Sequence, residues 1–152
     1  MKEEVSYLLD DLRNLFNNVE YNPYPVRFSP VAEYILSIDR IIYRIGLSVD
    51  GELYTSYRPK EMRAVMDVSL LKDPLRFINS LFVSLATQVP SKTVSPDEFI
   101  RDLYTEKNYL QIMVSNEYGK TGVGLLFTDA IVKFSLIHFP STNFVGDVDE
   151  RE

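Results

Sequence analysis

The sequence contains no cysteine. Disulfide bonds, thiolate zinc sites, iron–sulfur clusters and cysteine nucleophiles are therefore excluded. It also lacks any run of about 18 apolar residues, the length that a membrane helix needs. The N-terminus reads Met1-Lys2-Glu3-Glu4, whereas a secretory signal peptide needs a basic start and a continuous apolar run. These absences lead us to expect a cytoplasmic protein that does not contact a membrane.

Histidine is nearly absent, since His138 is the only one in the chain. A hydrolytic triad needs a nucleophile, a histidine and an orienting acid close together. The sequence around Ser135 does not resemble the strand-turn-helix elbow that exposes a catalytic serine. A structural role for His138 is therefore the favoured interpretation, and no catalytic residue is predicted.

The segment Gly119-Lys120-Thr121 looks like the end of a phosphate-binding loop. That loop requires a glycine five positions before Gly119, where this chain has Val114. It also requires a following helix, whose N-terminal amides bind the phosphate, and the pattern that follows here is that of a strand. We interpret residues 119–122 as a hairpin turn.

Carboxylates are plentiful, but their spacing indicates no metal site, which needs several of them at one point. The candidates are Asp10, Asp11, Asp97, Glu98, Asp102, Glu106 and Asp129. Capping explains Asp97 and Glu98, and the others fit a solvated surface. The sequence therefore predicts no cofactor and no metal, and it favours a protein that is not an enzyme.

The chain has 152 residues, of which 45% are hydrophobic and 25% charged. These values are typical of one globular domain that buries its own core. We expect a single compact domain over residues 1–140 and an acidic, flexible tail over 141–152. The formal net charge of −6 disfavours a freestanding nucleic-acid binder, because an acidic chain repels phosphates.

Apolar residues in the first segment recur in steps of three and four, which predicts a helix over about residues 3–18. The same spacing recurs from Val31 to Ile45, after Ser29 as the N-cap and Pro30 at the first helical position. Its isoleucines would also suit a strand, but the sustained period favours a second helix that ends at Gly46. Two matched stripes predict an antiparallel helix pair, with Leu8, Leu12 and Leu15 against Ile35, Ile38 and Ile42.

Residues 21–30 contain three prolines, which favour an extended connector between the two helices. Three aromatic residues lie along it, namely Tyr21, Tyr24 and Phe28. The favoured interpretation is that their rings pack onto the core. The alternative is a docking surface for a protein partner.

Asp50-Gly51 predicts the turn of a β-hairpin over residues 47–57, inserted after the second helix. Residues 59–71 fit a helix or a strand. Asp73-Pro74 begins a helix that Pro90 ends, with Leu75, Ile78, Leu81, Phe82, Leu85 and Val89 on one face. Ser95 and Glu98 form a capping box for a shorter helix, in which Phe99, Ile100 and Leu103 face inward.

The C-terminal third changes to a period of two, which predicts strands at 109–115, 123–127 and 131–139. In the last strand we expect Val132, Phe134 and Leu136 to face the core. The predicted fold is therefore α+β: amphipathic helices with an inserted hairpin and a small C-terminal antiparallel sheet.

One cluster suggests nucleic-acid contact, because aromatic faces stack on bases while cations hold phosphates. It comprises Tyr54, Tyr57, Arg58, Lys60 and Arg63, extended by Arg40 and Arg44 on the second helix. The favoured alternative is a solvated hairpin edge, because edge strands commonly carry such charges.

The leading hypothesis is a non-catalytic binding or assembly subunit that acts through protein–protein contacts, or as a homo-oligomer. The second is an accessory nucleic-acid-handling subunit. In outline alone, the expected helical domain with a β insertion is similar to the small subunits of archaeal CRISPR interference complexes, and no motif carries that analogy. The third is a small acidic protein of the chaperone type.

Overall fold

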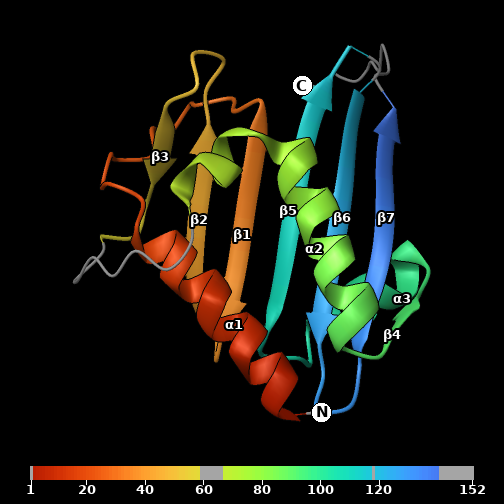
Figure 1. Ribbon diagram of the computed structural model, residues 1–152. Coiled ribbons are helices and arrows are strands. Elements are labelled where there is room, and N and C mark those ends of the chain that lie inside the picture. The colour runs from red at the N-terminus through yellow and green to blue at the C-terminus, as the bar shows by residue number, and fades with distance from the viewer. Residues whose placement is uncertain (1, 59–66, 118, 141–152) are drawn as a thin grey trace.

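Seven strands form one mixed sheet in the order β3-β2-β1-β5-β6-β7-β4 (Figure 1). The computed structural model describes residues 2–58, 67–117 and 119–140. The strands are β1 (Ala32–Ile38), β2 (Ile41–Leu47), β3 (Leu53–Thr55), β4 (Ser91–Thr93), β5 (Tyr109–Asn116), β6 (Gly119–Phe127) and β7 (Val132–Pro140). The helices are α1 (Lys2–Asn17), α2 (Pro74–Gln88), α3 (Pro96–Leu103) and the short 3₁₀ helix η1 (Val68–Lys72).

The sheet is continuous because β1 pairs with β2 on one side and with β5 on the other, both antiparallel. The strands β5, β6 and β7 follow as an antiparallel meander, and β4 adds at the edge parallel to β7. The prediction of a small, separate C-terminal sheet is therefore wrong. Its strands join those of the N-terminal half through the β1–β5 pairing, whose partners lie more than 70 residues apart.

The predicted second helix, and with it the antiparallel helix pair, is also wrong. Residues 32–47 form the β1–β2 hairpin, in which Ile38 pairs with Ile41 across a two-residue turn. Both turn residues, Asp39 and Arg40, have positive φ, as tight hairpin turns require. The residues that the structure buries include Ala32, Tyr34 and Leu36, which alternate with a period of two. The analogy to a helical domain with a β insertion loses its basis as well.

The helix predicted over residues 3–18 is confirmed as α1, and Leu12 and Leu15 are buried. Its partner is the sheet, since Phe16 makes edge-to-face contacts with Tyr34 of β1 and Tyr43 of β2. The predicted contacts with Ile35 and Ile42 are wrong. These two residues alternate with Tyr34 and Tyr43 along the strands, so the pleat directs them to the opposite face.

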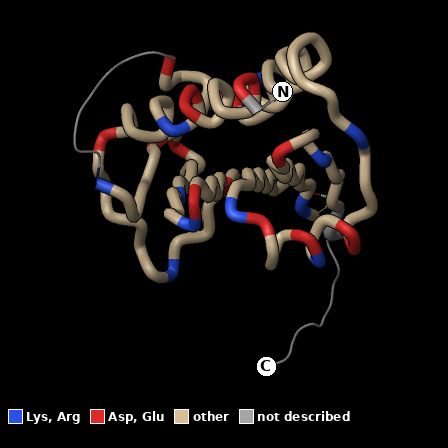
Figure 2. Tube along the Cα trace, turned by 90° about the horizontal axis from the view of Figure 1, so that it is seen from below, with Lys and Arg blue, Asp and Glu red and all other residues tan. Residues whose placement is uncertain are grey.

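Two helices cover one face of the sheet, and one helix lies on the other. Figure 2 looks along the strands and shows the layer that begins at the N-terminus on one side of the sheet. The main core lies under α1 and α2 and includes Leu12, Tyr34, Phe77, Ile112 and Leu125. A second, smaller cluster lies under α3, where Val94, Phe99, Leu126 and Ile137 are buried.

Local end signals position α2 and α3 as the sequence predicts. The Asp73 carboxylate accepts a hydrogen bond from the Arg76 amide at 3.2 Å, and the Ser95 hydroxyl accepts one from the Glu98 amide at 3.1 Å. The α3 helix lies close to the sheet because Gly124 has no side chain. A Cβ atom there would lie 2.4 Å from the Phe99 ring, so only glycine leaves room for that ring.

Other boundaries differ from the predictions. The β2–β3 hairpin contains the Asp50-Gly51 turn, but it forms an edge of the large sheet, and of these two residues only Gly51 has positive φ. Residues 119–122 belong to β6 and do not form a turn. Residues 68–72 are a 3₁₀ helix. The rest of the ambiguous 59–71 segment up to residue 66 lies outside the described residues, as does the predicted tail over 141–152.

Within the described residues, no helix combines the length and the apolarity that a membrane crossing would need.

Candidate functional site

The residues predicted to contact nucleic acid do not share one surface. The Tyr54 ring lies 4.7 Å from Phe28, centroid to centroid, on the face of the sheet opposite to α1. The Tyr57 ring lies 4.5 Å from Tyr43, whose ring contacts α1. The two tyrosines are therefore on different faces, so they cannot stack on successive bases of one strand.

The cations of that cluster are also dispersed. Arg44 forms an ion pair with Glu33 at 2.6 Å, which matches its charge within the protein. The Arg58 guanidinium lies 4.8 Å above the Tyr21 ring. Arg40 lies in the β1–β2 turn, at the opposite end of β2 from the Gly46–Tyr54 pair. Lys60 and Arg63 lie outside the described residues.

The aromatic residues of the connector fasten it to the open face of the sheet. Tyr24 and Phe28 lie against Gly46, where an added Cβ would approach each ring to 2.7 Å. The Tyr24 hydroxyl donates to Glu33 at 2.6 Å, and Arg44 lies 4.3 Å from the centre of the Tyr24 ring. Partial burial, followed by the Glu33 hydrogen bond, raises the pKa of Tyr24 to about 12. These contacts give both rings an intramolecular role, whereas Tyr21 is exposed and lies under the Arg58 guanidinium.

A cavity of about 320 Å³ lies beside this network, between the connector and strands β1, β2, β5 and β6. Lys120 lines it as a further cation, together with the half-buried Met113. Because Arg44 is already paired with Glu33, the cavity presents little free positive charge. Its chemistry does not favour a phosphate or a nucleic acid.

The outer side of α2 differs from the rest of the surface in its lack of charge. Among its fifteen residues, Arg76 is the only charged one. Phe77, Leu81 and Leu85 are buried against the sheet. On the solvent side, Leu75 is 67% exposed and Val83 is 68% exposed. The helix is therefore apolar well beyond the part that packs on its own sheet.

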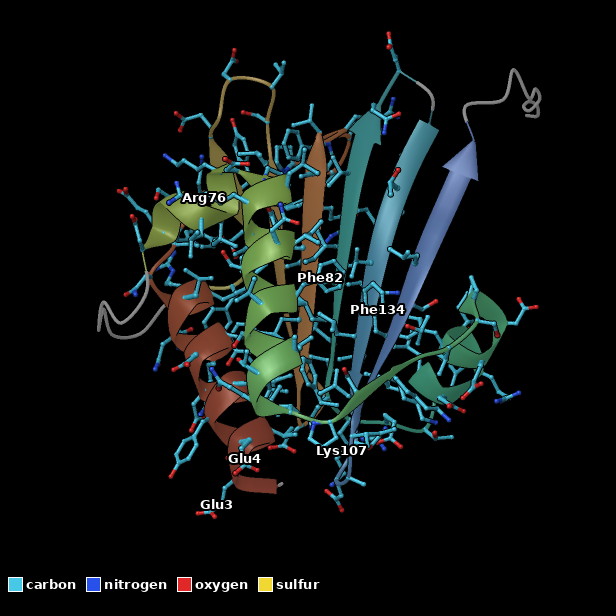
Figure 3. The ribbon with its side chains drawn as sticks, turned by 45° about the vertical axis from the view of Figure 1, so that its right-hand side comes forward. Glu3, Glu4, Arg76, Phe82, Lys107 and Phe134 are labelled. Carbon is cyan, nitrogen blue, oxygen red and sulfur yellow. The ribbon has the colours of Figure 1, made fainter. Side chains whose placement is uncertain are left out.

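A groove separates α2 from the edge of the sheet. The Phe82 ring projects from α2 toward β7 and meets Phe134 edge to face, with centroids 4.8 Å apart (Figure 3). A cavity of about 390 Å³ adjoins this pair, between α2, β4 and β7. Further along β7, Leu136 is 58% exposed. We call these five residues, Leu75, Phe82, Val83, Phe134 and Leu136, the α2 surface.

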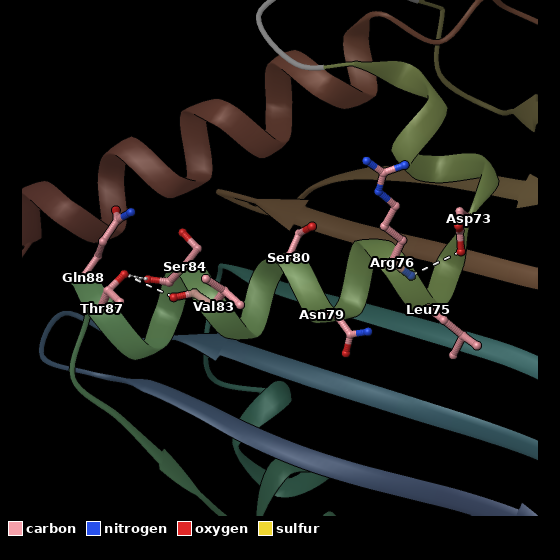
Figure 4. A pocket seen from close by; sticks show the side chains of 9 residues that line it. All are labelled: Asp73, Leu75, Arg76, Asn79, Ser80, Val83, Ser84, Thr87 and Gln88. Carbon is pink, nitrogen blue, oxygen red and sulfur yellow. Dashed lines mark hydrogen bonds between the residues drawn. The ribbon is translucent and has the colours of Figure 1, made fainter.

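The outer flank of α2 continues this surface away from the sheet. A shallow hollow of about 740 Å³ runs along the helix, and α2 with its Asp73 cap supplies all of its lining (Figure 4). The lining side chains are small or uncharged apart from Asp73 and Arg76 at one end. The hollow is too open to enclose a small molecule.

No described residue covers the α2 surface, because the helix layer ends beside it. In Figure 1, α1 crosses the strands on the β2 side, and α2 runs obliquely toward the lower ends of β6 and β7. Among the residues that the structure describes, no helix lies in front of the upper ends of those two strands. Among the described residues, β4 pairs with β7 only at Val132 to Phe134, so the outer edge of β7 is also open beyond that point.

Catalytic chemistry is not indicated in the described part of the chain. The side chain of Ser135 is fully buried in β7 and its hydroxyl has no hydrogen-bond partner there. No group of three metal-binding side chains occurs among the described residues. Comparison with known proteins gives no further guidance: no family model, no curated protein and no solved structure matches this chain.

Sequence reasoning did not find the α2 surface. It assigned Leu75 and Phe82 to the buried face together with Leu81 and Leu85, whereas Leu75 is exposed. A usable signal was the near absence of charge over residues 74–88, in a chain where a quarter of the residues are charged. A solvated helix of this length normally carries several charges on its outer side.

Proposed function

We propose that this protein is a non-catalytic binding subunit that acts inside the cell by holding another protein chain against its α2 surface. The observation that carries the proposal is the uncharged outer side of α2, where Leu75 and Val83 are about two-thirds exposed. Loss of charged residues is what distinguishes the centre of a protein interface from ordinary surface.

The physical basis is the free energy of burying apolar groups. Covering exposed leucine, valine and phenylalanine side chains is worth about 25 cal/mol for each Å² removed from water. At the α2 surface few charges lie in the way of this gain: Arg76 and the cap Asp73 lie at the N-terminal end of α2, and Lys92 of β4 lines the groove. A groove beside an apolar helix is also a common binding mode for a partner helix. A chaperone-type role would use the same surface.

Nucleic-acid handling remains a separate prediction of the sequence. It requires cations and aromatic rings on one surface, and the described members of that cluster lie on different faces. We expect no binding of a single-stranded oligonucleotide at low salt, where phosphate contacts are strongest. Salt-sensitive binding that is lost in Arg58→Ala would contradict this expectation.

A photoreactive side chain tests the proposed function in living cells. A benzophenone amino acid replaces Val83 in the full chain, and the control carries it in place of Val49, an 83% exposed valine in the β2–β3 turn. Both positions tolerate a large side chain because both are exposed. We expect a discrete cross-linked species from position 83 and none from position 49.

Two outcomes would overturn the proposal. One is the absence of any discrete adduct from position 83 and also from position 75. The other is equal adduct formation at positions 83 and 49, which would show that α2 meets other proteins no more than any exposed turn does.

A further inference from the structure

We infer that the chain bound at the α2 surface is a second copy of this protein, with the two α2 helices antiparallel across a two-fold axis. The inference rests on the proposed function and names its partner. In a two-fold interface the same patch occurs on both sides, so each copy must offer both the projecting and the receiving element. The α2 surface has both: an apolar helix ridge and, beside it, an open groove.

The ridge has the spacing that helix pairing requires. Leu75, Asn79, Val83 and Ala86 recur in steps of four, four and three, which places them on one side of the helix. They are exposed, and Asn79 is the only polar member. Two such ridges packed together would cover Leu75 and Val83 of both copies. The ridge of each copy would also shield from water the groove of the other copy, which contains the Phe82–Phe134 pair.

Charge allows a second copy at the α2 surface and disfavours a strongly basic partner there. Two chains of net charge −6 repel each other wherever their acidic surfaces approach. The α1 helix, for example, carries Glu3, Glu4, Asp10 and Asp11. The outer side of α2 carries no acid beyond its N-cap Asp73, so contact through α2 brings fewer acids together than contact through α1. A strongly basic partner would gain little there and would be drawn to the acidic surfaces instead.

The single charge of α2 also fits the antiparallel arrangement. Arg76 lies near the N-terminal end of the helix, and the last turn contains no basic residue. Carbonyl groups at a helix C-terminus favour a nearby cation. When two α2 helices run antiparallel, Arg76 of one copy comes close to Thr87 in the last turn of the other. Each copy then supplies the cation that the other helix lacks.

The size of the contact sets the expected affinity. A helix of fifteen residues is about 22 Å long, so a contact made by one helix and the adjoining strand edge falls at the lower end of specific interfaces. We therefore expect a dissociation constant in the micromolar range, which corresponds to about −8 kcal/mol at 1 µM.

Sedimentation equilibrium of the purified full chain tests the inference. Across roughly 1 to 200 µM, a range that brackets the expected dissociation constant, the mass should rise from 17.6 kDa toward twice that value. Val83→Glu should weaken the association about tenfold or more, because it buries a charge in the contact. Val49→Glu makes the same substitution at another exposed valine and should leave the dissociation constant unchanged.

A charge exchange tests the antiparallel orientation. Arg76→Glu places an acid against the partner's helix C-terminus and should weaken the association severalfold, by up to about 1 kcal/mol per contact or fivefold. Adding Thr87→Lys to that variant gives the new acid a partner in the other copy and should restore the association. Arg13→Glu makes the same charge change on α1, whose Arg13 is exposed, and controls for general repulsion.

The outcomes separate this inference from the proposed function. If the chain is strictly monomeric at every concentration, the inference that the partner is a second copy is overturned. If position 83 still cross-links in cells to a protein of another mass, the proposed function stands with a different partner. If neither self-association nor cross-linking occurs, both are overturned. Self-association that Val83→Glu leaves unchanged overturns the assignment of the contact to α2.

Discussion

The two long helices lie on the same face of the sheet, yet their outer surfaces differ in kind. The α1 helix has six charged residues among sixteen, and Val5, Leu9, Leu12, Leu15 and Phe16 are buried. The α2 helix has one charged residue among fifteen, and two of its apolar side chains are about two-thirds exposed. One helix therefore separates the core from water, whereas the other presents apolar groups on both sides.

If a partner covers α2, as we propose, the apolar pattern of a helix reports the surface that a partner buries as well as the surface that the chain itself buries. On α1 the buried apolar side chains face the sheet, and Tyr7 is the one large apolar side chain of this helix that is well exposed, at 65%. On α2 the apolar arc is wider than the contact with the sheet, and the excess lies beside the uncovered ends of β6 and β7. The comparison would not hold if the exposed Leu75 and Val83 proved necessary for the stability of the monomer.

The most direct test of this difference is to truncate one leucine to alanine in each helix. Leu12 is 1% exposed and Leu75 is 67% exposed. Leu12→Ala should lower the free energy of unfolding by about 2–5 kcal/mol, since it leaves a cavity in the core. Leu75→Ala should change it by less than about 0.5 kcal/mol. Urea denaturation of dilute, monomeric protein measures both, and equal losses would show that Leu75 is part of the monomer core.

A smaller effect is expected at the start of α2. The Asp73 side chain accepts a hydrogen bond from the Arg76 amide, so Asp73→Ala should cost about 0.5–2 kcal/mol of unfolding free energy. Asp73→Asn keeps an accepting oxygen and is the matched control. If Asp73→Ala had no effect in denaturation, packing on the sheet alone would hold the first turn of α2.

On the opposite face of the sheet, the contribution of Tyr24 to stability should depend on pH. Burial and the Glu33 hydrogen bond raise the pKa of Tyr24 to about 12, above the value near 10 of an exposed tyrosine. The contribution of Tyr24 to stability is therefore complete below about pH 10 and is lost as the pH rises toward 12. Spectrophotometric titration of the folded protein should lose one late transition in Tyr24→Phe. A loss near pH 10 instead would mean that Tyr24 is not held against Glu33.

The smallest effect should come from the charged surface of α1. Arg13 pairs with Asp10 one turn earlier, and both side chains are largely in water. Arg13→Gln should change the unfolding free energy by about 0–0.5 kcal/mol, and molar salt should abolish even that difference. A loss of more than about 1 kcal/mol of unfolding free energy would mean that this pair contributes more than an exposed ion pair does.

The sequence is sufficient to predict elements whose signals are local. The first helix, the Asp73-Pro74 start of α2 and the Ser95–Glu98 cap of α3 are all read from residues within one turn of each other. The same holds for the strand character of residues 109–115. Neighbouring residues determine each of these features, so a single chain carries the full signal.

The wrong predictions concern features that depend on contacts between residues far apart in the sequence. Tyr34 pairs with Ile112, and this kind of long-range partner makes residues 32–38 a strand although their apolar spacing also fits a helix. The cluster around Tyr54 failed for a related reason: β3 ends at Thr55, and the chain beyond it brings Tyr57 against Tyr43, whereas Tyr54 lies against Phe28 on the other face. The α2 surface was missed because exposure depends on which strands a helix leaves uncovered, and that follows from the whole topology.

The Phe99 ring fits closely on Gly124, so the position of α3 depends on the absence of a side chain at residue 124. Alanine at this position would bring its Cβ to 2.4 Å from the Phe99 ring, so Phe99 and α3 would have to shift on the face opposite to the main core. The cluster under α3 and the core under α1 and α2 are therefore packed separately, on opposite faces of one sheet. The face that carries α2 can adapt to a partner while the opposite face stays as it is.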